Sequence, residues 1–210
     1  MTTVASPVLI DTVLGHRGIA QHGRKLAVWR REIAVVGTFT LLTAAAAQVR
    51  VSLSFTPVPI TGQTLAVLLA AASLGARRGA ASQILYWLLG MLGLPFYAAG
   101  AGGWKAATGA TMGYFIGFIL AAGVVGRLAE YRHDRKVLSS LAAMALGTVI
   151  IYVCGAAWLS WSLNIPIATG NQNAIALGVT PFLLGDLVKM LLAALTTSAS
   201  WNLVNRLRAE

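Results

Sequence analysis

Long apolar stretches with almost no charged residues are the feature that most limits how this chain can fold. Apolar residues make up 57% of the sequence and charged residues 10%, whereas a water-soluble domain carries about 25% charged residues. So few charges cannot cover the surface of a soluble globule, which argues against a cytosolic enzyme. Because backbone groups in a bilayer must be paired internally, we predict an all-α integral membrane protein.

Six segments of the chain have the composition of membrane helices. A spanning helix needs about 20 residues, so 210 residues allow roughly five to seven spans. Pro57 and Pro59 lack a backbone N–H and interrupt the chain after the first segment. We expect a cytoplasmic N-terminal segment over residues 1–31 and a single six-helix membrane domain over residues 32–206. The expected helices are 32–49, 62–74, 79–93, 111–128, 137–161 and 181–206.

The basic residues are distributed unevenly between the two ends of these segments. With the N-terminus in the cytoplasm, 13 of the 16 Lys and Arg residues fall on the cytoplasmic side, and Arg50, Lys105 and Lys189 are the exceptions. Cytoplasmic loops of membrane proteins carry such an excess of positive charge. We therefore expect both termini in the cytoplasm. The same bias explains the net charge of +10 without a nucleic-acid partner.

Asp186 and Lys189 are the two charges placed deep in an apolar segment, LLGDLVKMLLAAL. A charge at the centre of the bilayer costs about 2.5–3.5 kcal/mol on insertion scales, and such residues usually pair and serve a site. Residues three apart share one helix face, so both side chains can reach one cavity. The pair suits a ligand with N–H donors beside a C=O acceptor, such as a urea or an amide, and equally a zwitterion. An ion pair that only fastens the helices is the alternative.

Other kinds of chemistry find little support in the sequence. His16, His22 and His133 lie in hydrophilic segments with no second ligand four residues away. The chain has no GxxxxGK[ST] motif for nucleotide phosphates, so it cannot be its own ATPase. No Ser/His/Asp or Cys/His group gathers on one side of the membrane. We expect no catalytic residue, no metal and no cofactor.

Small residues at a spacing of four recur in the first helix, as Thr40, Thr43, Ala44 and Ala47. Such ridges let two helices approach closely in lipid. Packing within the chain and a surface for a partner protein are equally consistent with this pattern.

Three segments carry motifs that can be compared with a known family. They are PVPITGQTLAVLLAAASLGARRGAASQILYWLLGMLGLPFYAAGAGG (57–103), TGATMGYFIGF (108–118) and TPFLLGDLVKMLLAA (180–194). Together they resemble BioY, the biotin-binding substrate (S) component of energy-coupling factor (ECF) transporters, over about residues 34–206. The resemblance implies a six-helix bundle of the S-component type. It would lie in the bacterial cytoplasmic (inner) membrane as a multi-pass protein and bind biotin with high affinity.

The resemblance also implies where biotin would be held. Asp186 and Lys189 would bind the ureido ring, and residues 57–64 would act as a lid. From its position as the only basic residue of the Gly-rich outer loop, we further expect Lys105 to attract the valerate carboxylate of biotin. The further candidate substrate-binding residues are Thr61, Gln63, Gln83 and Tyr86. For Gln83 and Tyr86, hydrogen bonds that only pack helices together are an equally good explanation.

By the same resemblance, the energy for uptake would come from partner proteins. These would be a transmembrane coupling protein and two ABC ATPase subunits, with the small residues of the first helix as the docking face. One alternative is a self-sufficient secondary biotin carrier driven by an ion gradient, in which Asp186 carries a proton. Another is a structural or assembly membrane protein, which would leave the buried charge pair unexplained.

Overall fold

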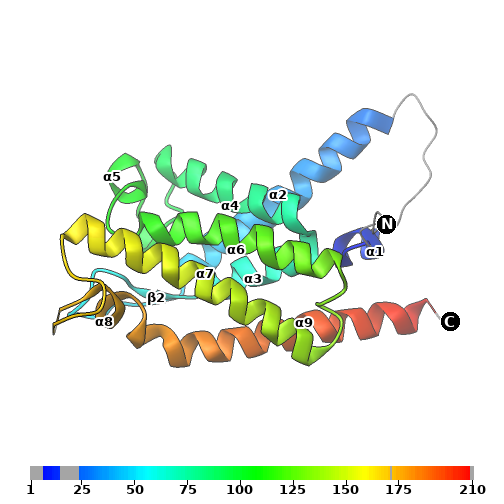
Figure 1. The fold of residues 1–210 in the computed structure, drawn as a ribbon. Coiled ribbons are helices and arrows are strands. Elements are labelled where there is room, and N and C mark those ends of the chain that lie inside the picture. Colours follow the sequence, from blue (N-terminus) through cyan, green and yellow to red (C-terminus); the bar gives the residue numbers. More distant parts are fainter. Residues whose placement is uncertain (1–6, 15–23, 171, 209–210) are drawn as a thin grey trace, which may run out of the picture.

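The computed structural model describes residues 7–14, 24–170 and 172–208, and within them the fold is a bundle of helices (Figure 1). Its six longer helices overlap the six expected ones. They are α2 (Arg24–Gln48), α3 (Gln63–Leu74), α4 (Ala76–Met91), α6 (Met112–Glu130), α7 (Val137–Leu163) and α9 (Leu183–Leu207). Shorter elements are α1 (Leu9–Leu14), the 3-10 turn η1 (Ala98–Gly100), α5 (Trp104–Ala107), α8 (Ala174–Gly178) and the 3-10 turn η2 (Thr180–Phe182).

Three helical segments of the described chain are long and apolar enough to cross a membrane. They are Met112–Glu130, Val137–Leu163 and Ala174–Leu207, the last of which joins α8, η2 and α9. The helix α3 is apolar but has only 12 residues. Length and composition alone therefore support a membrane protein with three candidate spans.

The first long helix begins earlier than expected. It starts at Arg24 rather than near residue 32, because residues 24–31 are mostly good helix formers and contain neither Gly nor Pro. The additional helix α1 lies further towards the N-terminus. His16 and His22, two of the histidines excluded as metal ligands, lie outside the described residues.

Close contact between α6 and α7 forms the centre of the bundle. A side chain at Gly113 would lie 2.3 Å from the backbone oxygen of Cys154, and one at Gly117 would lie 2.8 Å from Cα of Ile151. The two helices can approach this closely only because glycine has no Cβ. Since α6 also packs on α3 and α4, it connects these two helices to α7 (Figure 1).

The small residues of the first long helix are used inside the chain. Thr40, Thr43, Ala44 and Ala47 are all buried, and α2 packs on α3 and α4. The Thr40 hydroxyl donates to the carbonyl oxygen of Ser82 on α4 at 3.0 Å. This burial favours packing within the chain over a partner-docking face for these four residues, because helices of the same chain already occupy the space beside them.

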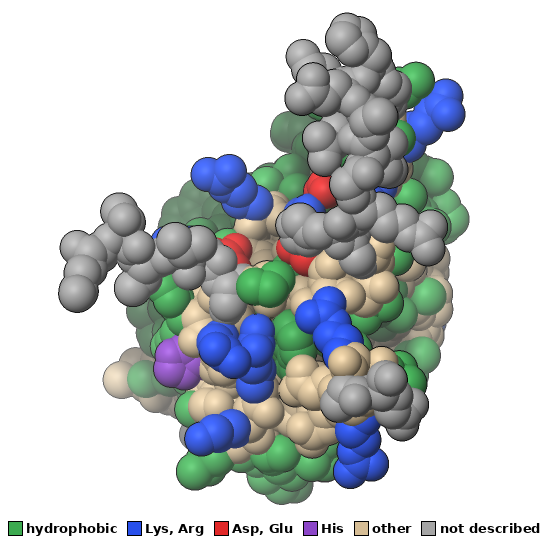
Figure 2. Space-filling view, turned by 90° about the vertical axis from the view of Figure 1, so that its right-hand side faces the viewer, with side chains coloured by type: hydrophobic (Ala, Val, Ile, Leu, Met, Phe, Trp, Pro, Cys, Tyr) green, Lys and Arg blue, Asp and Glu red, His purple; other side chains and the backbone are tan. Residues whose placement is uncertain are grey.

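The two ends of the bundle differ in their chemistry. One end carries α1, the α3–α4 and α6–α7 turns and the end of α9, and Lys and Arg side chains are spread over it (Figures 1 and 2). The opposite end carries α5, α8 and a hairpin of β1 (Arg50–Val51) and β2 (Ile60–Thr61), which pair antiparallel with Arg50 opposite Thr61. This distribution agrees with the predicted charge asymmetry, and the assignment of the basic end to the cytoplasm remains a prediction.

Candidate functional site

A cavity of about 500 Å³ lies at the end of the bundle that carries the β1–β2 hairpin. Its wall is drawn from the hairpin, the η1–α5 segment and the facing parts of α3, α6, α7 and α9. This volume lies in the range of sites for small organic ligands, about 300–1,000 Å³. The lining mixes aromatic rings with a small number of charged groups, which is the composition expected of such a site.

Asp186 and Lys189, the charge pair singled out in the sequence, lie together in the wall of this cavity. The Lys189 Nζ atom lies 2.7 Å from Asp186 Oδ1, and the two side chains are 16% and 5% exposed. Asp186 also accepts a hydrogen bond from the Thr64 hydroxyl at 2.9 Å and one from the Tyr152 hydroxyl at 2.5 Å. Three donors offset much of the cost of removing this carboxylate from water. The pair is thus both an ion pair and part of a cavity wall.

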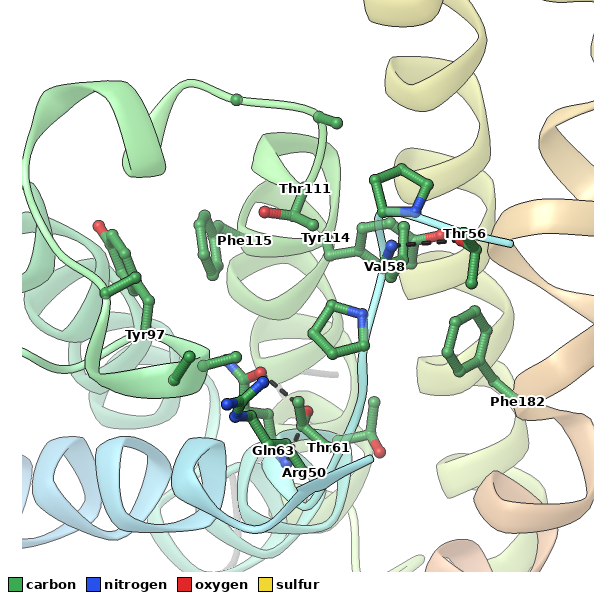
Figure 3. A pocket seen from close by; sticks show the side chains of 18 of the residues that line it. Arg50, Thr56, Val58, Thr61, Gln63, Tyr97, Thr111, Tyr114, Phe115 and Phe182 are labelled. Carbon is green, nitrogen blue, oxygen red and sulfur yellow. Dashed lines mark hydrogen bonds between the residues drawn. The ribbon is translucent and has the colours of Figure 1, made fainter. Parts of the chain in front are cut away.

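Thr61 and Gln63 also line the cavity, and they are linked to a residue behind it. The Thr61 hydroxyl donates to Gln63 Oε1 at 2.8 Å (Figure 3). Gln63 Nε2 in turn donates to the Tyr86 hydroxyl at 2.7 Å. Tyr86 is completely buried and is not among the lining residues. Tyr86 therefore contacts the cavity wall only indirectly, through Gln63.

Gln83 does not reach the cavity. Its Nε2 atom lies 3.3 Å from the Thr43 hydroxyl and 3.1 Å from the Ser82 hydroxyl, at the contact of α4 with α2. These are packing hydrogen bonds between helices, one of the two roles that the sequence left open. The expectation that Gln83 and Tyr86 line the site is not met, because their face of α4 is turned towards other helices.

The aromatic part of the wall was not singled out from the sequence. It consists of Tyr97, Tyr114, Phe115, Phe118, Tyr152 and Phe182. The rings of Tyr97 and Phe115 stack with centroids 4.7 Å apart, and Phe182 lies on the other side of the segment that crosses the site (Figure 3). Burial raises the pKa of Tyr97, which lies outside the long helices, to about 12. Aromatic residues at helical spacing resemble ordinary core residues, so a helical pattern carries no signal that these rings face a cavity.

The segment between the two strands covers part of the cavity. Thr56, Pro57, Val58 and Pro59 all line it, and Val58 is buried. The Thr56 hydroxyl donates to the carbonyl oxygen of Leu177 in α8 at 2.7 Å, so the segment rests on α8. This is the position that the predicted lid would occupy.

Two further cations line the cavity beside Lys189. They are Lys105, in the last turn of α5, and Arg50, whose Nη1 donates to the Ser52 hydroxyl at 2.7 Å. With Asp186 as the acidic residue among the lining residues, the cavity wall carries an excess of positive charge. Such a wall favours a ligand with an anionic group.

Comparison with known proteins identifies the family of this chain. Residues 20–206 match the model of the BioY family. The chain belongs to the BioY family. The biotin transporter BioY of Thermotoga maritima is 37% identical to it, over 79% of this chain and 92% of that protein. The probable biotin transporter BioY of Pyrococcus horikoshii is 36% identical, over 76% of this chain and 89% of that protein.

A solved structure supports the same fold. The crystal structure of the S-component for biotin from an ECF-type ABC transporter matches this chain with a TM-score of 0.70 and 23% sequence identity. The match covers 91% of this chain and 96% of that structure. The BioY bundle is therefore of the S-component type. The family match begins at residue 20, so α1 precedes the part of the chain that is shared with the BioY family.

Proposed function

We propose that this chain is the biotin-binding S component of an ECF transporter and that it serves biotin uptake with high affinity. Membership of the BioY family and the names of its relatives support this function. The observation that carries it is the Asp186–Lys189 pair in the wall of a cavity that also presents aromatic rings and further cations. The chain is accordingly a binding subunit for transport rather than an enzyme.

The geometry of the pair suits the ureido ring of biotin. Oδ2 of Asp186 accepts one hydrogen bond, from Tyr152, and retains capacity to accept another from a ureido N–H. An ammonium has three donors, and Lys189 uses one of them on Asp186, so it can donate to the ureido oxygen. Both contacts are charge-assisted, which makes them stronger than hydrogen bonds between neutral groups.

The rest of biotin would extend from this pair towards the mouth of the cavity. The bicyclic ring has apolar faces, which the rings of Phe115 and Phe182 can cover. The valerate carboxylate would be attracted by Lys105, with Arg50 as a second cation close to the hairpin. Thr61 and Gln63 offer further polar contacts, and residues 57–64 would act as the lid.

Uptake requires an energy source that the sequence does not encode, since it has no phosphate loop. We propose that a transmembrane coupling protein and two ABC ATPase subunits supply it. In this arrangement the chain spans the bacterial cytoplasmic membrane six times over residues 32–206, with residues 1–31 and both termini in the cytoplasm. Because the small face of α2 is buried, we propose that the coupling protein contacts a different surface of this chain.

Isothermal titration of the purified chain tests the binding function. Biotin and desthiobiotin, which both carry the ureido group, are expected to bind, and thiamine is not. Absence of biotin binding by the folded protein would refute the proposal. Uptake into proteoliposomes with and without the ATPase module tests the transport class, because accumulation without the module would identify a secondary carrier.

A further inference from the structure

The short helix α1 (Leu9–Leu14) is the part of the described fold that lies outside the family match. It lies before the residues that match the BioY family, yet it packs on α3 and α9, which lie inside or at the edge of that match. Val8, just before the helix, and Thr12 within it are buried. The helix lies at the basic end of the bundle, opposite the cavity described above (Figure 1).

Two arginines from distant parts of the chain hold α1 in place. Nη1 of Arg78, on α4, lies 2.8 Å from Asp11 Oδ1. Nη2 of Arg208, just after α9, donates to the carbonyl oxygen of Thr12 at 3.0 Å. The contacts of α1 therefore reach across the end of the bundle from α4 to the end of α9.

The helix α1 covers a polar hollow rather than filling the apolar core. A second cavity, of about 740 Å³, lies beside it, and Asp and Glu side chains lie among Lys and Arg at this end (Figure 2). An element with few buried apolar contacts separates from a fold at a low cost in free energy. The charged residues that line this cavity are Asp11, Glu32, Arg77, Arg78, Glu130 and Arg208.

Arg78 has a second acidic partner that makes release of α1 easier. Its Nε and Nη2 atoms donate to the two carboxylate oxygens of Glu32, on α2, at 2.6 and 2.7 Å. When Asp11 leaves, Arg78 keeps this bidentate pair and is not left as an unpaired charge. Loss of the contact with Asp11 therefore leaves the charge of Arg78 paired.

We propose that α1 is an autoinhibitory strap, which covers the end of the bundle that the energising subunits approach and is displaced when they engage. The inference rests on the proposed function, because ATP-hydrolysing subunits act from the cytoplasm and the charge asymmetry assigns this end to that side. Releasing the strap speeds energised uptake. It leaves biotin affinity unchanged, because the biotin cavity lies at the opposite end.

The test uses the full chain, alone and together with the coupling protein and ATPases. Asp11→Asn removes the ion pair to Arg78, and Arg208→Gln weakens the second attachment independently. Asp11→Glu keeps the charge, and Val13→Thr alters an exposed residue of the same helix. Three quantities are measured for each protein: hydrogen exchange of residues 9–14, biotin affinity of the purified chain, and the initial rate of ATP-driven biotin uptake.

For Asp11→Asn and Arg208→Gln we expect faster hydrogen exchange of residues 9–14 and an initial uptake rate raised by up to about fivefold. A factor of about five in rate corresponds to the free energy of one part-exposed ion pair. Asp11→Glu and Val13→Thr should match the wild type. Faster exchange with unchanged or slower uptake would contradict the autoinhibitory role of α1. Unchanged exchange in both Asp11→Asn and Arg208→Gln would contradict it as well. A wild-type chain that fails to bind biotin contradicts the proposed function instead, so the two failures are distinguishable.

Discussion

The hydroxyl of Tyr152 donates a 2.5 Å hydrogen bond to Oδ2 of Asp186, which joins α7 to α9 inside the wall of the cavity. Thr64, at the start of α3, donates to the other oxygen of the same carboxylate. Three helices therefore meet at one acidic group, and the residue proposed to bind the ureido ring also fixes the helices around it. A change at Asp186 is expected to affect both ligand binding and the stability of the bundle.

Removing either member of the Asp186–Lys189 pair should weaken biotin binding strongly. Loss of one partner of a buried charged pair typically costs about 2–5 kcal/mol in binding, or roughly 30-fold to several thousand-fold in affinity. Asp186→Asn keeps the size and an acceptor oxygen and should lie at the low end of this range, whereas Lys189→Ala should lie at the high end. Isothermal titration with biotin gives these affinities.

The melting temperatures of ligand-free Asp186→Asn and Lys189→Ala show whether the pair binds biotin or only stabilises the helix bundle. If the pair served only to hold α9 in the bundle, both variants would melt earlier but would bind biotin almost normally. A near-normal affinity of folded Lys189→Ala for biotin would show that the pair is not part of the binding site.

Breaking the contact between the lid segment and α8 should speed the release of biotin. Thr56→Val removes the hydroxyl that donates to the carbonyl oxygen of Leu177 but keeps a side chain of similar size. A hydrogen bond of this kind contributes about 1 kcal/mol, so the dissociation rate should rise about fivefold. Thr56→Ser retains a donor and serves as the matched control. Equal dissociation rates in the wild type and Thr56→Val would show that this contact does not hold the lid.

Lys105 should contribute to affinity only when the ligand carries a free carboxylate. Lys105 is exposed, and an exposed charge contributes at most about 1 kcal/mol, so Lys105→Ala should weaken biotin binding by up to about fivefold. The methyl ester of biotin should be bound almost equally by both proteins. Arg50→Ala, tested in parallel, shows whether the second cation of the cavity has this role instead. An equal loss for both ligands in Lys105→Ala would exclude a contact with the carboxylate.

Enlarging Ala47 should destabilise the fold rather than block a partner. Ala47 is fully buried between helices of the same chain, and overpacking a close contact costs about 1–3 kcal/mol or more. Ala47→Trp should therefore lower the melting temperature of the purified chain by several degrees. Ala45→Trp, at an exposed position of the same helix, should leave it nearly unchanged. A stable Ala47→Trp protein that binds biotin but lacks ATP-driven uptake would restore the docking face to this position.

Asp134, in the turn between α6 and α7, should make stability depend on pH. Burial raises the pKa of this carboxyl above its ordinary value of 3.8, although Trp201 Nε1 donates a hydrogen bond to it. A group whose pKa is raised in the folded state stabilises the fold at low pH, and this contribution is lost as the pH rises through the raised pKa. Asp134→Asn should therefore melt above the wild type at neutral pH, with a difference that shrinks towards pH 4. A difference that does not vary with pH would show that the carboxyl is not perturbed.

The sequence by itself determined the class of the protein, the approximate helices and the charge pair. A chain with so few charges and such long apolar segments is suited to a lipid bilayer rather than to water. The spacing of Asp186 and Lys189 places both residues on one face of one helix. These are properties of single segments. The sequence also indicated the family, because the family's motifs occur in order along the chain.

Only the tertiary structure decided which helix covers which face. The pattern of Thr40, Thr43, Ala44 and Ala47 predicts a close helix contact, and in the structure α3 and α4 of the same chain pack on this helix. Tyr152 and the aromatic wall were missed for the same physical reason. Periodicity shows which residues share one face of a helix, whereas the neighbour that meets this face is set by packing between segments far apart in the sequence.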